Sequence, residues 1–159
     1  MTTHNRRSAM FRSSAFLCLL SLFAVNASTA ATADPMSPVG AWTTIDDETK
    51  KPKSVVRISE KDGIISGAVE KILDPAKQDS KCEECADDDP RKGKPVVGMT
   101  VLTGLKKEGD NVYGGGRILD PNNGKSYNAK VTVIEGGKKL EMRGSILFIG
   151  RTQTWIRAE

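Results

Sequence analysis

The pair Cys82 and Cys85, separated by two glutamates, has a spacing found in redox dithiols and in half of a zinc site. The same spacing also suits a structural disulfide. Such a bond would close a ring of four residues and contribute on the order of 2 kcal/mol, so it would stiffen its own loop more than the whole fold. The residue types therefore allow three kinds of site.

The acidic surroundings of these cysteines help to choose among the three. Glu83, Glu84 and the run 87–89 would raise the pKa of either thiol, whereas redox cysteines need a stabilised thiolate. A metal site would need further ligands from carboxylates such as Asp79 or Asp87. A disulfide between Cys82 and Cys85 is the favoured hypothesis, and the redox pair and the metal site stay as alternatives. We predict no bound metal.

The first 33 residues have the pattern of an export signal. Three arginines precede an apolar core at 15–25, and the small residues at 31–33 (Ala-Thr-Ala) form a cleavage motif. The core is too short for a permanent membrane-spanning helix. We predict a signal peptide at 1–33, one domain at 34–159, and a location in the periplasm or the medium without a membrane anchor.

Removal of this segment would change the chemistry that the chain can perform. Its single histidine, His4, would leave, which excludes Ser-His-Asp and Cys-His catalysis and histidine-ligated zinc or haem. Three of the 24 basic residues would also leave, and none of the 20 acidic ones. The remaining domain is nearly neutral and lacks the charge of a nucleic-acid-binding protein. We predict that it is not an enzyme and needs no cofactor.

The elements that must position these groups are strands. Apolar and polar residues alternate with period two, and glycine-rich turns separate the alternating segments. The predicted strands are 39–45, 53–60, 64–73, 99–107, 112–119, 126–134, 138–143 and 151–157.

Short connections between these strands predict an antiparallel meander. Closure into an all-β, eight-stranded up-and-down barrel would remove both exposed sheet edges and could enclose a small ligand. The exception is the loop 74–98, which carries both cysteines, and loops of this length are usually functional or mobile. Residues 145–150 depart from alternation, and 146–149 form an unbroken apolar run between glycines, which predicts a bulged strand or an apolar rim loop.

Several motifs resemble those of a known family. Gly40 and Trp42 on the first strand, with Arg151 and Arg157 on the last, are similar to the lipocalin signature, in which a basic side chain packs across a tryptophan and closes the barrel floor. The wider set resembles an exported Gram-negative family, domain of unknown function 2147, over residues 38–158. It consists of Gly40-Ala41-Trp42-Thr43-Thr44, Cys82-x-x-Cys85, Gly114-Gly115-Gly116-Arg117-Ile118-Leu119-Asp120-Pro121, Gly124-Lys125-Ser126-Tyr127, and Arg143-Gly144 before Gly150-Arg151-Thr152-Gln153-Thr154-Trp155. This resemblance implies a lipocalin-like (calycin-type) barrel and no known reaction.

A monomeric protein that binds a small apolar or amphipathic ligand inside the barrel is the leading functional hypothesis. Glycines at 104 and 114–116 leave neighbouring strands without bulky side chains, which favours a cavity. An amphipathic anion such as a fatty acid would bury its tail, and an inward-facing arginine would meet its carboxylate. The predicted lining is Val101, Leu105, Tyr113, Arg117 and Val131.

Two alternatives belong to other functional classes. The first is an envelope structural or interaction protein whose barrel is filled by side chains and which acts through its charged loop. The second is a thiol redox protein that uses Cys82 and Cys85. A cavity inside the barrel is the feature that separates the leading hypothesis from the first alternative.

Overall fold

The computed structural model describes residues 1–2 and 34–158. Apart from its first two residues, the predicted signal peptide lies outside this range. No helix in the described part of the chain is long and apolar enough to cross a membrane.

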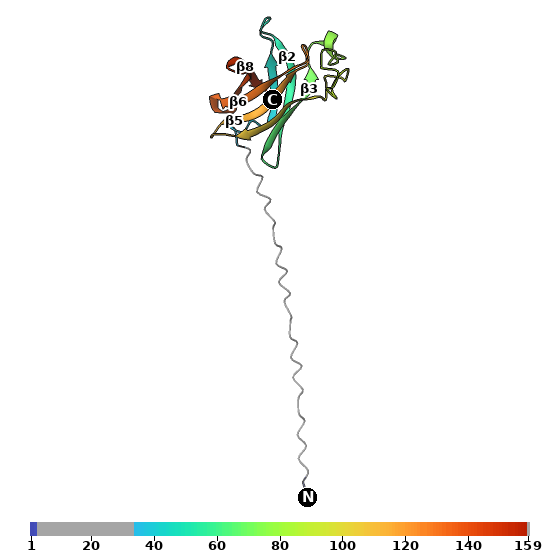
Figure 1. Cartoon of the computed structure of the whole chain (residues 1–159). Helices are drawn as coiled ribbons and strands as arrows, with labels where there is room; N and C mark the ends of the chain where they lie inside the picture. The colour runs from blue at the N-terminus through green and yellow to red at the C-terminus, as the bar shows by residue number, and fades with distance from the viewer. Residues whose placement is uncertain (3–33, 159) are drawn as a thin grey trace. The chain divides into compact units, whose positions relative to one another are not determined.

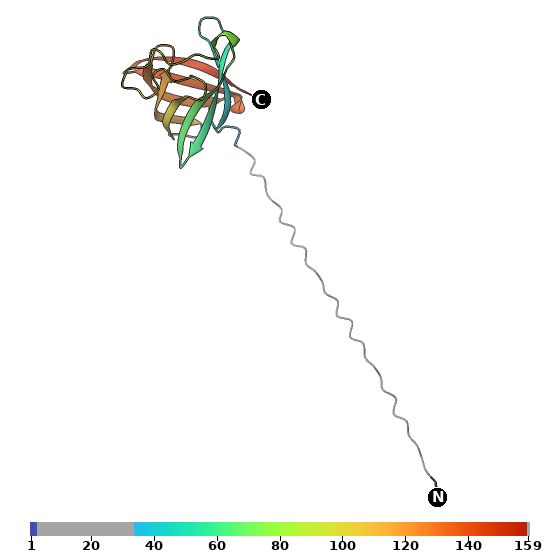
Figure 2. The same ribbon diagram turned by 90° about the vertical axis from the view of Figure 1, so that its right-hand side faces the viewer.

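The barrel consists of eight antiparallel strands that pair in sequence order and close into a ring. Figures 1 and 2 show the strands wrapping around one axis, with the β3–β4 loop drawn in green outside the sheet. The predicted fold class is confirmed. The strands are β1 (Gly40–Ile45), β2 (Pro52–Lys61), β3 (Ile64–Ile72), β4 (Thr100–Lys107), β5 (Val112–Asp120), β6 (Lys125–Ile134), β7 (Lys139–Ile146) and β8 (Ile149–Arg157). Two short 3₁₀ turns, Pro75–Lys77 and Glu135–Gly137, lie in the connections.

One end of the barrel is closed by Trp42 and Arg157. The indole is fully buried and donates from Nε1 to the carbonyl of Pro38 at 2.7 Å. The guanidinium of Arg157 lies over the ring, 4.2 Å from its centroid. A cation in this position contributes roughly 0.5–2 kcal/mol. Burial lowers the pKa of Arg157.

The same guanidinium holds the chain that leads into β1. It donates to the carbonyls of Pro35, Ser37 and Val39, and through Nε to Gly137 in the β6–β7 turn. Gly40 makes this approach possible, because a Cβ there would lie 2.9 Å from Arg157 Nη1. Its φ of +133° is also rarely adopted by other residues.

Arg151 does not take part in this closure, contrary to the expectation that both arginines would. Arg151 lies six residues before Arg157 on β8. At the rise of a strand, this spacing separates the two residues by about 20 Å, so Arg151 lies at the opposite end of the barrel. Both residues face the same side of β8. Position along the strand, and not strand face, therefore decides which arginine reaches Trp42.

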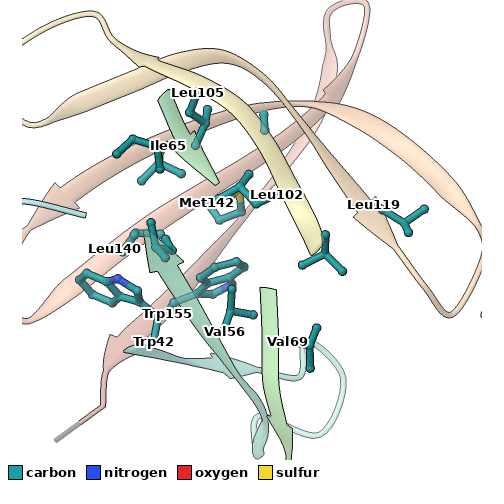
Figure 3. Close-up of a cluster of buried hydrophobic side chains, with 14 of the residues drawn as sticks. Trp42, Val56, Ile65, Val69, Leu102, Leu105, Leu119, Leu140, Met142 and Trp155 are labelled. Atoms are coloured by element: carbon teal, nitrogen blue, oxygen red, sulfur yellow. The ribbon is translucent and has the colours of Figure 1, made fainter. Parts of the chain in front are cut away.

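The half of the barrel next to Trp42 is filled by side chains. Figure 3 shows buried side chains from both halves of the barrel, among which Leu140 lies beside the two tryptophans, and Leu140 pairs with Trp155 across β7 and β8. Each such side chain contributes about 1.5–3 kcal/mol when it is fully buried. The residues with almost no exposed surface are Trp42, Ile58, Ile65, Leu102, Leu105, Val131, Val133 and Leu140.

Replacement of the closing indole tests this description of the floor. Trp42→Ala should lower the free energy of unfolding by roughly 3–5 kcal/mol, because it leaves a cavity and removes the partner of Arg157. Denaturant unfolding of the variant and of the unaltered protein measures the difference. A loss below about 1 kcal/mol would show that Trp42 does not hold the floor together.

Candidate functional site

The half of the barrel away from Trp42 contains an open cavity of about 730 Å³. Its mouth is lined by residues at the ends of β1 and β2, in the β5–β6 turn and in the β7–β8 hairpin. The apolar part of its wall includes Val56, Val69, Val101, Ile118, Met142 and Trp155. The interior is thus filled at one end and hollow at the other.

Side-chain size along the strands explains this division. On β1 the inward residues are Trp42 and then Thr44, and the corresponding position on β2 is Ser54, whose hydroxyl lies 2.7 Å from that of Thr44. On β7, Leu140 and Met142 are followed by Gly144. Small residues therefore replace large ones on β1, β2 and β7 towards the mouth.

A chain of polar contacts runs from the mouth down to the apolar wall. Arg151 Nη2 lies 2.8 Å from Asp47 Oδ2, and the amide of Gln153 donates to the same oxygen. Gln153 Oε1 in turn accepts a bond from Trp155 Nε1 at 3.4 Å. These contacts connect the β1–β2 loop with β8, and they place a cation and a carboxylate at the opening.

Asp47 also lies where the barrel wall is weakest. β1 and β8 share two residue pairs, Trp42 with Arg157 and Thr43 with Ile156, both near the closed end. Towards the mouth, the bonds from Asp47 to Arg151 and Gln153 join the two edges. Side chains thus complete the wall where the backbone ladder stops.

Four of the five residues predicted to line the ligand site are buried, but they do not lie together in the cavity. Val101 lines it. Leu105 and Val131 are buried in the filled half of the barrel. Tyr113 is also buried, near the closed end, and this burial raises the pKa of its hydroxyl.

Arg117 faces solvent, so the prediction of an inward guanidinium is wrong. A β-bulge is the cause: β5 contains one extra residue between Tyr113 and Gly116 relative to β6, and Gly115 has a φ of +72°. One extra residue reverses which face the following side chains occupy. Arg117 therefore donates to Asn128 Oδ1 at 2.9 Å and to the carbonyl of Ser126 at 3.0 Å on the outer wall.

The glycines of β4 and β5 do not produce the cavity, again contrary to expectation. A Cβ at Gly116 would lie 2.8 Å from Leu105 Cγ, so the missing side chain makes room for Leu105. Gly104 has a φ of +74° and provides irregular backbone in β4. The glycine that borders the cavity is Gly144, where a Cβ would find ordinary contact distances of 3.6–3.9 Å.

Comparison with known proteins identifies the family. Residues 40–157 match the family described as "Uncharacterized protein conserved in bacteria (DUF2147)". The chain belongs to the DUF2147 family. This confirms the resemblance seen in the sequence motifs.

The barrel of this DUF2147 protein is also similar to a solved structure, protein HP1028 from the human pathogen Helicobacter pylori, which belongs to the lipocalin family. The two share 25% identity with a TM-score of 0.68, over 77% of this chain and 84% of HP1028. The comparison with curated proteins finds no match. The lipocalin-like fold predicted from the motifs is thus confirmed.

The long loop of the DUF2147 barrel connects β3 to β4 and contains a disulfide between Cys82 and Cys85. Both cysteines are almost fully buried. The loop packs on the β5–β6 turn, where Cys82 Sγ lies 3.7 Å from the carbonyl of Pro121. Among residues 1–2 and 34–158, no group of three or more His, Cys, Asp or Glu side chains could hold a metal ion.

An ion pair fixes the far part of this loop. Arg91 donates to Asp89 through Nε at 2.9 Å and Nη2 at 2.7 Å, and through Nη1 to the carbonyl of Thr100 at the start of β4. The side-chain and backbone bonds from Arg91 lower the pKa of Asp89 to about 2. Because this pKa is lowered, the stabilisation from the pair is complete above the ordinary pKa of an aspartate and is lost as pH falls through about 2.

The contact between the loop and the β5–β6 turn can be tested at Gly124. A Cβ there would lie 1.7 Å from the Glu84 carbonyl oxygen, so Gly124→Ala should displace the loop and expose the disulfide. Under native conditions a thiol reductant should open Cys82–Cys85 much faster in this variant than in the unaltered protein, because exchange requires access to the sulfur.

Gly63→Ala is the matched control for this experiment. Gly63 has a similar φ, +76° against +66°, but has no atom within 4 Å of its Cβ position. The control therefore carries the backbone strain without the clash. Equal reduction rates in the two variants would contradict the described packing.

The pKa of Asp89 provides a second test of the loop. Arg91→Gln should raise this pKa from about 2 towards 3.8, but only part of the way, because the backbone N–H of residue 91 still donates to the carboxylate. Carboxyl carbon shifts followed by NMR during an acid titration measure it. An unchanged pKa would show that the guanidinium does not hold the carboxylate.

Proposed function

We propose that this protein binds a small amphipathic molecule in the open half of its barrel and catalyses no reaction. The observation that carries the proposal is the cavity of about 730 Å³, which has an apolar inner wall and opens to solvent. Cavities of about 300–1,000 Å³ are typical of small-molecule sites in proteins. The filled half of the barrel sets the depth to which a ligand can enter.

The lining suits a molecule with two different ends. An apolar tail would contact Trp155, Met142 and the valines of β2–β4 at the inner end. A polar head would remain at the mouth beside Arg151 and Lys53, which both line the opening. Arg151 thus replaces Arg117 as the candidate partner for an anionic head group.

The ion pair at the mouth shapes this recognition. Asp47 contacts one nitrogen of the Arg151 guanidinium, and a guanidinium has further N–H groups that can meet a carboxylate. The side chain of Arg151 is about two-thirds exposed, so a ligand head can reach it. We infer that an anion binds next to Asp47 without displacing it from Gln153.

We place this function outside the cytoplasm, in the periplasm or the medium. The export pattern of residues 1–33 is the main support. A disulfide between Cys82 and Cys85 is also typical of proteins in oxidising compartments. Burial of both sulfurs favours a structural role for this bond over thiol exchange.

Titration of lipid-free protein with fatty acids of increasing chain length tests the proposal. Affinity should rise about fourfold for each added CH₂, from a transfer free energy of about 0.8 kcal/mol. It should then level off when the tail meets the filled half of the barrel. Isothermal calorimetry or displacement of a fluorescent fatty acid gives the dissociation constants.

Two variants test the location of the binding site, and a third variant serves as a control. Gly144→Leu should abolish binding by filling the cavity, and Arg151→Gln should weaken binding of the acid but not of the corresponding alcohol. Arg117→Gln, on the outer wall, should change neither. Absence of binding at every chain length would overturn the proposal and leave the interaction-protein hypothesis ahead.

A further inference from the structure

The tip of the β7–β8 hairpin exposes four consecutive large apolar side chains. Ile146 is 52% exposed, Leu147 80%, Phe148 88% and Ile149 77%. The other exposed large hydrophobic residues of segment 34–158 occur singly along the chain. Single exposed apolar residues are ordinary on protein surfaces, whereas a contiguous apolar patch usually marks an interaction site.

The turn at this tip has a backbone conformation that large apolar residues rarely adopt. Ile146 pairs with Ile149, so the turn consists of Leu147 and Phe148. Leu147 has a φ of +53°, a conformation in which such turns ordinarily contain glycine, asparagine or aspartate. Leu147 and Phe148 are 80% and 88% exposed, so they gain little packing in return for this strain. Folding therefore does not explain the residues at the tip.

Positive charges lie beside the apolar tip. Arg151 is at the mouth of the barrel, and Arg143 lies on the outer wall with its guanidinium next to Gly150. Residues 142–155 contain both arginines and no acidic residue. Arg151 is paired with Asp47 of the β1–β2 loop, so the hairpin presents an apolar end with Arg143 as its cationic flank, which is complementary to an anionic lipid surface.

We infer that this hairpin tip docks on the surface of a bilayer that contains anionic phospholipids. The four apolar side chains enter the boundary between head groups and acyl chains, and Arg143 contacts lipid phosphates. Ile146, Leu147 and Ile149 also line the cavity mouth, so docking turns the opening towards the lipid. If the proposed ligand binding holds, an amphipathic molecule could pass from bilayer to barrel without crossing water.

Vesicle flotation with the purified protein tests the docking without any added ligand. Phe148→Ser should reduce partition onto vesicles of phosphatidylcholine and phosphatidylglycerol by about tenfold or more, because the most exposed apolar side chain of the tip is lost. Ile64→Ser is the matched control, since Ile64 is an exposed residue of the β2–β3 hairpin at the closed end. All variants have the same N-terminus, so its contribution cancels.

The charge contribution is tested at the same two hairpins. Arg143→Gln should weaken binding to anionic vesicles about fivefold and leave binding to pure phosphatidylcholine unchanged. Lys61→Gln, in the β2–β3 hairpin, should change neither. Equal effects of Arg143→Gln and Lys61→Gln on binding to anionic vesicles would overturn the proposed contact between Arg143 and lipid phosphates.

Insertion itself can be observed with Phe148→Trp and Ile64→Trp. Brominated lipids should quench the added tryptophan at the β7–β8 tip and not the one in the β2–β3 hairpin. Phe148 and Arg143 do not line the cavity, so fatty-acid titration of Phe148→Ser should match the unaltered protein. Failure of the unaltered protein to float with anionic vesicles, or equal flotation of the two serine variants, would overturn the docking proposal and would not affect the proposed ligand binding.

Discussion

The contact of Arg157 with Trp42 and with the carbonyls around it is the interaction on which the barrel depends. β1 and β8 share two residue pairs, which is a short ladder for the strands that close the ring. One guanidinium joins the chain before β1, the β6–β7 turn and the last strand, and it lies over the ring of the buried indole. Because closure is concentrated at this end, the other end can remain open, with Asp47 joining the strand edges there.

The distribution of side-chain volume along the strands then decides what the barrel can do. Large inward residues fill the half next to Trp42, and Thr44, Ser54 and Gly144 leave the other half hollow. The mouth combines that cavity with the Asp47–Arg151 pair and with the apolar β7–β8 tip. Ligand recognition and lipid docking are thus proposed for one end of the molecule, and the disulfide loop packs beside it on the β5–β6 turn.

The strands and their order could be predicted from the sequence, because period-two alternation and glycine turns are local signals. The residues of β5 that face inward could not be predicted, because the bulge before Gly116 shifts the alternation by one residue and turns Arg117 outward. Arg151 and Arg157 lie on the same face of β8, so alternation alone could not tell which one meets Trp42. The cavity depends on which side chains meet across the barrel, which strand alternation does not show; of the five predicted lining residues, Val101 is part of its wall.

The barrel interior is hollow at one end and filled at the other. Nuclear Overhauser contacts between a bound long-chain fatty acid and the protein methyl groups distinguish the two halves. We expect contacts from the acyl chain to Val69, Val101 and Met142, and none to Leu105 or Val131. Contacts that reach Leu105 and Val131, or that fall solely on the outer wall, would contradict this division of the interior.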